Sequence, residues 1–195
     1  MKRRLTRDDI ISLAQYGQQR RERRARVSEL KKKRRVEVGP FDTFYFECYE
    51  TMWHQVHEML WIEKGGEEQI ADELAAYNPL IPNGDELVAT VMIEIDDPLR
   101  RQRVLGELGG VEKAMYLSFA GEMVRGVAEE DRENTRADDN KASSVQFMRF
   151  PFTAAQKEKF KAPGSQVLVG VDHPNYGHIA VMPETVRQEL VRDFA

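Results

Sequence analysis

The hydrophobic pattern changes its period near Leu87, and this change constrains the fold more than any other feature of the chain. Before Leu87, most apolar residues recur at the three- and four-residue spacing of a helix, clearest in residues 49–63, and only the short stretches 34–38 and 43–47 alternate. After Leu87, apolar and polar residues alternate, as in residues 144–152. We therefore expect an α+β protein: a mostly antiparallel sheet with helices packed on one face, preceded by a basic helical N-terminal arm.

Capping residues, prolines and glycines set the expected boundaries of the elements. Helices are expected at residues 7–18, 20–33, 49–64, 67–77, 98–108, 153–160 and 183–193. Strands are expected at residues 34–38, 43–47, 88–95, 114–120, 122–128, 144–152, 166–171 and 178–182. Residues 129–141 are acidic and lack apolar periodicity, so they are expected to form a mobile loop.

Length and composition limit the class of protein. The chain has 195 residues, of which 41% are hydrophobic and 32% charged, and it is expected to form one α+β domain at 36–195 behind an arm at 1–35. No stretch has the apolar length of a membrane span, and the start lacks a signal peptide, so a cytoplasmic protein is expected. Cys48 is the single cysteine, which excludes an internal disulfide and a cysteine-built metal site. We expect a plain buried thiol there.

The net charge of −4 hides a division between the arm and the rest of the chain. Residues 1–35 carry 14 Lys and Arg against 4 Asp and Glu, whereas residues 36–195 carry 15 against 29. Such asymmetry indicates an interaction surface. Its candidate residues are Arg20, Arg21, Arg23, Arg24, Lys31, Lys32, Lys33, Arg34 and Arg35.

The target of the basic arm is open to three interpretations. The arm could pack on its own acidic domain or on another subunit, which would make a homo-oligomer. It could instead dock an acidic protein partner. Nucleic acid is the least favoured target, because the arm has few aromatic residues to stack on bases and no base-reading motif.

The segment 47–63 holds the candidate metal ligands. On a helical wheel, Glu50, His54 and His57 form a stripe beside the core face, and side chains three or four apart on a helix are neighbours. Imidazole and carboxylate suit iron, zinc or manganese. Further ligands would have to come from Glu58 or from the distant His173 and His178.

Two other interpretations of these histidines remain open. His54 and His57 could line the border of the helix, hydrogen-bonded or solvated, or His57 or His173 could carry a proton in metal-free acid–base chemistry. If Thr51 is the N-cap, Glu50 lies outside the helix and the stripe is broken.

The remaining candidates are pocket residues. Glu63 falls on the apolar side of its helix, where it would either fray into solvent or pair with an arginine such as Arg149. The segment 172–177 predicts a strand–turn–strand, and as a loop at a sheet end it could equally present Asp172, His173 and Tyr176 to a ligand.

Five short sequence motifs of the chain occur together in one known family. They are Val38-Gly-Pro, Gln55-Val-His-Glu-Met-Leu60, Tyr77-Asn-Pro-Leu-Ile-Pro82, Ser143-Ser-Val-Gln-Phe147 and Val171-Asp-His-Pro-Asn-Tyr176. In this order the chain resembles the bacterial family known as domain of unknown function 3501. Members are often encoded beside rubrerythrin-like and iron–sulfur proteins, so the resemblance implies a role in a redox or oxidative-stress system.

Two hypotheses of function follow. The first is an accessory protein of such a redox system, holding one non-haem metal ion. The second is a non-enzymatic adaptor whose basic arm docks an acidic partner, for which a rubrerythrin-like or iron–sulfur protein is the candidate that the resemblance implies.

Overall fold

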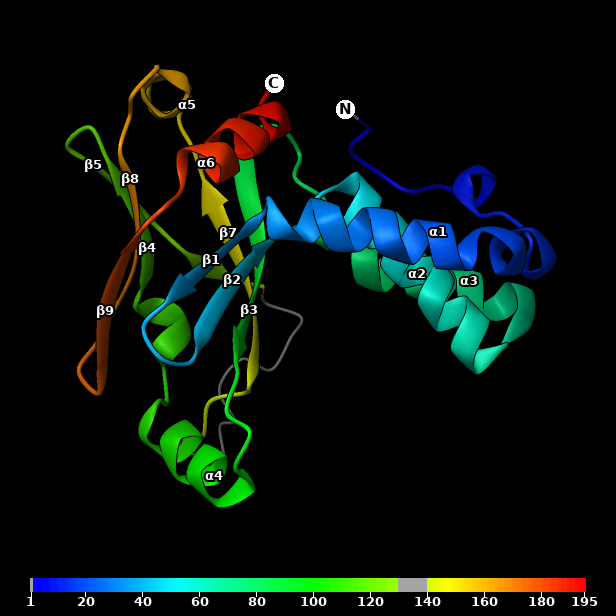
Figure 1. Ribbon diagram of the computed structural model, residues 1–195, viewed down its shortest axis with the longest axis horizontal. Helices are drawn as coiled ribbons and strands as arrows, with labels where there is room; N and C mark the ends of the chain where they lie inside the picture. The colour runs from blue at the N-terminus through cyan, green and yellow to red at the C-terminus, as the bar shows by residue number, and fades with distance from the viewer. Residues whose placement is uncertain (1, 130–139) are drawn as a thin grey trace.

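The computed structural model describes residues 2–129 and 140–195, and within these ranges the chain forms two antiparallel sheets and a layer of helices (Figure 1). The predicted α+β class is confirmed. The helices are α1 (Leu13–Lys32), α2 (Tyr49–Glu63), α3 (Gly66–Tyr77), α4 (Pro98–Glu107), α5 (Ala154–Lys161) and α6 (Glu184–Leu190), with 3₁₀ turns η1 (Arg7–Asp9), η2 (Asn78–Leu80), η3 (Val111–Lys113) and η4 (Val191–Asp193).

The strands divide over two sheets, where the sequence had predicted one. The first has the order β1 (Arg35–Val38), β2 (Asp42–Phe46), β3 (Glu86–Ile93), β7 (Val145–Pro151), β6 (Val127–Ala128). The second has the order β5 (Glu122–Arg125), β4 (Met115–Phe119), β8 (Val167–His173), β9 (Tyr176–Val181). All the strand pairs are antiparallel. Alternation along a strand cannot tell which sheet the strand joins, because it reports only that one face is buried.

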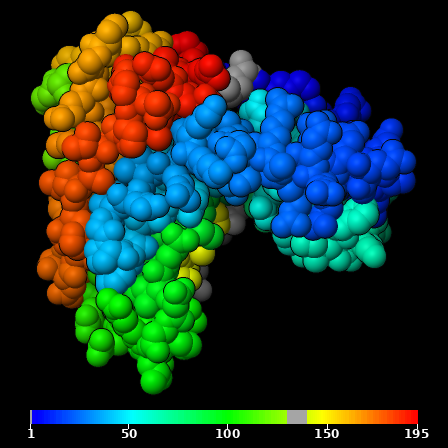
Figure 2. Space-filling view, viewed as in Figure 1, coloured from blue at the N-terminus to red at the C-terminus, as the bar shows by residue number. Residues whose placement is uncertain are grey.

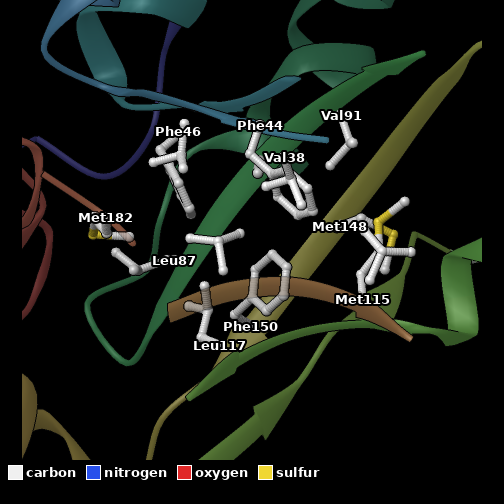
Figure 3. Close-up of a cluster of buried hydrophobic side chains, with 14 of the residues drawn as sticks. Val38, Phe44, Phe46, Leu87, Val91, Met115, Leu117, Met148, Phe150 and Met182 are labelled. Carbon is white, nitrogen blue, oxygen red and sulfur yellow. The ribbon is translucent and has the colours of Figure 1, made fainter. Parts of the chain in front are cut away.

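The inner faces of the two sheets form the main core. Phe44, Leu87 and Phe150 from the first sheet pack in one buried cluster with Met115 and Leu117 from β4 (Figure 3). These side chains occupy alternate positions of their strands, as a sheet with one face in the core requires.

The outer face of the five-stranded sheet carries the helical layer. Val88 and Phe147 on that face pack with Met52 and Val56 of α2 in a second cluster. Leu5, from the segment before α1, is 1% exposed and joins the same cluster. One face of this sheet therefore meets helices as expected, and its other face meets the second sheet.

The N-terminal region forms one long helix where two had been predicted. Ser12 caps α1 at its start, with its hydroxyl accepting from the Gln15 N–H, and the helix then runs through Gly17 to Lys32. A β-carbon at Gly17 would lie 2.7 Å from the Trp61 ring, so the glycine allows close packing of α1 on α2 and does not mark a helix end. None of the helices in the described ranges combines the length and apolar run needed to cross a membrane.

Candidate functional site

Helix α2 carries the predicted site and lies between α1 and α3. Its N-cap is Cys48, and the Thr51 hydroxyl accepts the Cys48 N–H from inside the helix, so Glu50 belongs to the first turn. Burial raises the pKa of the Cys48 thiol to about 11, despite the nearby Arg34 charge, and so keeps the thiol protonated and unreactive. The expectation of a plain buried thiol is confirmed.

His57 uses both of its ring nitrogens within the protein. Nδ1 lies 2.7 Å from the Trp53 carbonyl oxygen, and Nε2 accepts the Ile11 N–H at 3.2 Å. The two contacts assign the proton to Nδ1, because Nε2 must be the acceptor. Burial lowers the pKa of His57 to about 4, and the imidazole is therefore neutral near pH 7. His57 ties the segment before α1 to α2, and neither nitrogen is left for a metal ion.

Glu58 is the centre of a polar network between α1 and α2. Its carboxylate accepts two hydrogen bonds from Arg20, each 2.9 Å long, and a third from the Tyr16 hydroxyl at 2.6 Å. The Tyr16 hydroxyl also lies 3.1 Å from Nδ1 of His54. The hydrogen bond from Arg20 is the main reason that the pKa of Glu58 is lowered, so this carboxylate is ionised and satisfied.

The distant histidines lie on the other side of the molecule, in the β8–β9 hairpin of the four-stranded sheet (Figure 1). His173 contacts the Gly109 carbonyl oxygen through Nε2 at 3.2 Å and accepts the Asn175 N–H at Nδ1. His178 is exposed and its ring packs edge-on against Tyr176. Neither histidine approaches α2.

The predicted metal site is therefore not assembled. Across residues 2–129 and 140–195, no group of three or more His, Cys, Asp or Glu side chains is placed to hold a metal ion. The structure separates the proposed ligands over two parts of the fold and ties several of them to other partners; they are Glu50, His54, His57, Glu58, His173 and His178.

The pairing of Glu63 with Arg149 is wrong. Glu63 is exposed at the end of α2 and accepts a hydrogen bond from Gln69. Arg149 instead contacts Glu86 at 2.8 Å and Glu129 at 2.6 Å on the outer face of the sheet. The helix ends at Glu63, which is why its side chain reaches solvent.

The β8–β9 turn serves the fold. The buried Tyr176 hydroxyl donates to the Val38 carbonyl and accepts the N–H groups of Phe41 and Asp42, and so fastens the β1–β2 hairpin to β9. Burial raises the pKa of Tyr176 to about 12. Asp172 is half exposed and pairs with Arg125 at 2.7 Å. The predicted mobile loop at 129–141 lies almost entirely outside the described residues.

The predicted partner-binding cations fall into three groups. Arg34 is wrong as a binding residue: it is 1% exposed and forms a buried ion pair with Asp193, and its guanidinium also donates to the Phe46 and Glu47 carbonyls. Arg20 and Arg23 lie in the contact with α2, where Arg23 covers the Trp53 ring. The others are Arg21, Arg24, Lys31, Lys32, Lys33 and Arg35, and apart from the partly buried Lys31 all of these are exposed.

Five of these cations form what we call the basic flank of α1: Arg21, Arg24, Lys31 and Lys32 of the helix, and Arg35 at the start of β1. They line two adjoining hollows, of about 390 Å³ beside Trp61 and about 320 Å³ beside His54. Within the described part of the chain, Arg21, Arg24 and Lys31 form no ion pair, and Lys32 and Arg35 have only exposed partners, Glu29 and Glu37. Exposed pairs of this kind contribute little, so the flank remains strongly cationic.

A cleft that the sequence did not predict opens next to the basic flank, between the outer face of the five-stranded sheet and α2. Its volume is about 410 Å³, and Glu47, Thr90 and Lys31 are among its lining residues. Figure 2 shows the molecule hollowed between the strands β3 and β7, in green and yellow, and the helices α1–α3. Only the fold brings Glu47 and Thr90 together, 43 positions apart in the chain, so no local pattern could have indicated the cleft.

The fold and these surfaces define a two-sheet α+β protein with a basic helix and a neighbouring cleft. Residues 4–194 match the family described as protein of unknown function (DUF3501), and the chain belongs to that family. It is also similar to the crystal structure of a novel protein of unknown function from Burkholderia pseudomallei K96243, with 39% sequence identity and a TM-score of 0.91 over 98% of this chain and 99% of the other. No curated protein matches the chain.

Proposed function

We propose that the protein is a non-enzymatic adaptor that docks an acidic protein partner through the basic flank of α1. The observation that carries this proposal is the gathering of four cations on one side of α1 with Arg35 of β1 beside them, three of the five without an ion pair in the described ranges. A surface of one charge sign attracts a partner of the opposite sign and orients it before contact.

The helix that presents the flank is held in place before any partner arrives. Arg20 and Tyr16 fix α1 to Glu58 of α2, and Arg23 lies 4.7 Å from the centre of the Trp53 ring. A surface that is already ordered loses little conformational entropy on binding. This arrangement supports docking in which α1 keeps its position on α2.

The hollows along the flank favour a protein over nucleic acid. They combine guanidinium and ammonium groups with the apolar side chains Val27 and Trp61, and two exposed acidic residues, Glu22 and Glu29, lie on the same helix. Carboxylates of a partner would accept from the cations while apolar side chains fill the hollows. In keeping with the family resemblance, an iron–sulfur or rubrerythrin-like protein is the first partner to test, and the adaptor would then serve a redox or oxidative-stress system.

The test compares two double variants of the full chain with equal changes of charge. Arg21→Glu with Arg24→Glu reverses the flank, and Arg100→Glu with Arg103→Glu reverses two exposed cations of α4, away from the flank. Affinity for the purified partner is measured by calorimetry at low and moderate salt, and a DNA duplex is measured in parallel.

We expect the flank variant to bind the partner at least about tenfold more weakly, a change of about 1.4 kcal/mol, and the control variant to bind normally. We also expect the affinity of the unmodified protein to fall as salt rises. Equal loss in both variants, or tight binding to DNA with none to the partner, would overturn the proposal.

A further inference from the structure

The cleft beside the basic flank has the size of a small-molecule site. Its volume of about 410 Å³ lies within the range of about 300–1,000 Å³ that is usual for ligand pockets. The helices pack on the outer face of the five-stranded sheet at Val88 and Phe147. Strand β3 continues beyond this contact, and the cleft forms there. Thr90 and Met92 are therefore left lining a hollow beside the part of the sheet face that the helices cover.

Glu47 carries an unsatisfied buried oxygen in this cleft. The residue is 4% exposed; its Oε1 accepts the Thr90 hydroxyl at 2.8 Å, and its Oε2 has no hydrogen-bond partner among the described residues. Leaving a buried carboxylate oxygen without a donor is costly, and proteins rarely do so without a reason. A ligand that supplies the missing donor would recover that cost on binding.

The other walls of the cleft are mainly apolar. Met52 and Leu80 come from the helical side, and Met92, Val145 and Phe147 come from the strands. Methionine side chains adapt their shape to a ligand, and an aromatic ring offers a flat contact surface. These walls suit the hydrocarbon part of a small molecule.

The charge of the cleft selects between kinds of ligand. A carboxylate ligand would be repelled by Glu47 if it entered with its charged end first. A protonated amine would instead place N–H donors and a positive charge against Glu47 Oε2, and a buried charge is tolerated when it is paired and hydrogen-bonded. Lys31 lines the cleft on the side of the basic flank, which favours insertion of the amine end toward Glu47 and away from the lysine.

We propose that this cleft binds a small organic amine with an apolar body, whose ammonium group donates a hydrogen bond to Glu47 Oε2. The ligand body lies against Met52, Met92 and Phe147, and Thr90 holds the carboxylate in position through Oε1. The cleft shares Lys31 with the basic flank. It can still be tested apart from partner docking, because amine binding depends on Glu47 and docking on Arg21 and Arg24.

The test uses three probes of similar size that differ at one end: 2-phenylethylamine, ethylbenzene and 3-phenylpropionate. Each is titrated into full-length protein whose methionine methyl groups are labelled for NMR. The variants are Glu47→Gln, which keeps the shape but weakens the acceptor, and Glu50→Gln, which removes one carboxylate charge from an exposed position of α2. A third variant, Met92→Trp, fills the cleft.

We expect 2-phenylethylamine to shift the methyl signals of Met52 and Met92, and to bind at least about tenfold more tightly than the other two probes. Glu47→Gln should remove that preference, Glu50→Gln should preserve it, and Met92→Trp should abolish binding of all three probes. If Glu47→Gln does not fold, Thr90→Val is used instead. It removes the hydroxyl that holds the Glu47 carboxylate in position, and it should therefore still weaken amine binding.

Equal binding of the three probes by the unmodified protein would overturn the proposal. So would amine binding that is the same in Glu47→Gln, or titrations in which neither methyl signal moves. The Arg21→Glu, Arg24→Glu variant should bind the amine normally, so failure of partner docking and failure of this site can be told apart.

Discussion

The guanidinium of Arg20 holds the carboxylate of Glu58 through two hydrogen bonds of equal length, both 2.9 Å. This pair spans the contact between α1 and α2, and the Tyr16 hydroxyl donates to the same carboxylate. A bidentate arrangement fixes distance and direction together. Much of the predicted basic arm is thereby part of the folded body, which matches the interpretation in which the arm packs on its own domain.

Replacing Glu58 by alanine should loosen α1 from α2. Arg20 and Tyr16 would both lose their acceptor, and we expect a loss of about 1–3 kcal/mol in the free energy of unfolding. Limited digestion with trypsin should cut the arginine-rich α1 faster than in the unmodified protein. Glu22→Ala, an exposed change on α1 itself, is the control and should leave the digestion rate unchanged. Equal rates in all three proteins would contradict the prediction.

Replacing Arg34 by methionine should destabilise the protein strongly. The substitution removes the buried partner of Asp193 and leaves that carboxylate 1% exposed with no cation against it. Breaking a buried ion pair on one side costs about 3–5 kcal/mol. Urea unfolding gives the value, and Arg35→Met, at the exposed neighbouring position, should change it little. A loss below that of the control variant would show that the pair is not needed.

The buried carboxyl group of Asp42 should make the protein less stable as the pH rises from acid to neutral. It is 1% exposed on the inner face of β2, both of its carboxylate oxygens lack partners in the described ranges, and burial raises its pKa to about 7. Because the folded form holds the proton more tightly than the unfolded form, stability is full below the unfolded pKa and falls as pH rises from about 4 to about 7.

The Asp42→Asn variant should lack this dependence. The shift corresponds to about 4 kcal/mol at about 1.4 kcal/mol per pKa unit, so the variant should be more stable than the unmodified protein at pH 8. Urea unfolding from pH 4 to pH 8 measures the difference. Parallel curves for the two proteins across that range would refute the assignment of the titration to Asp42.

The buried imidazole of His57 should have the opposite effect: it should make the protein less stable as the pH falls. Its pKa is lowered to about 4 mainly by burial, so the unfolded chain takes up a proton before the folded protein does. The stability that His57 contributes is full above its unfolded pKa of 6.5 and is lost as pH falls toward 4. The difference in stability between the unmodified protein and His57→Gln, measured by urea unfolding, should therefore shrink by about 3 kcal/mol between pH 7 and pH 4. A difference that does not vary with pH would exclude His57 as the titrating group.

The expected elements agree with the structure where local chemistry decides them. Asp97 caps α4 ahead of Pro98, and Thr153 caps α5, both at the predicted positions. The predicted break between two N-terminal helices is absent, and the sequence does not show that Gly17 lies inside one helix where the Trp61 ring packs against it. The division of the strands over two sheets also escaped prediction, since pairing partners such as β3 and β7 are far apart in the chain.

The candidate site was predictable only in part. The predicted stripe placed Glu50 with His54 and His57, but each histidine contacts a different element: His54 the Tyr16 hydroxyl and His57 the Ile11 N–H. Helical spacing shows which side chains share a face and not what packs against that face. The inference of a metal site failed at that step, because the neighbours turned out to be a hydroxyl and a peptide N–H.

The buried pair of Arg34 and Asp193 joins residues 159 positions apart, and this has a consequence for biosynthesis. During translation, Arg34 leaves the ribosome long before Asp193 is synthesised. Until then the Arg34 guanidinium has no carboxylate partner from η4 and stays open to water. Closing the pocket around Arg34 must wait for η4, which follows all the described strands in the chain. A chain cut before η4 would hold all the described strands but lack the carboxylate that pairs with Arg34.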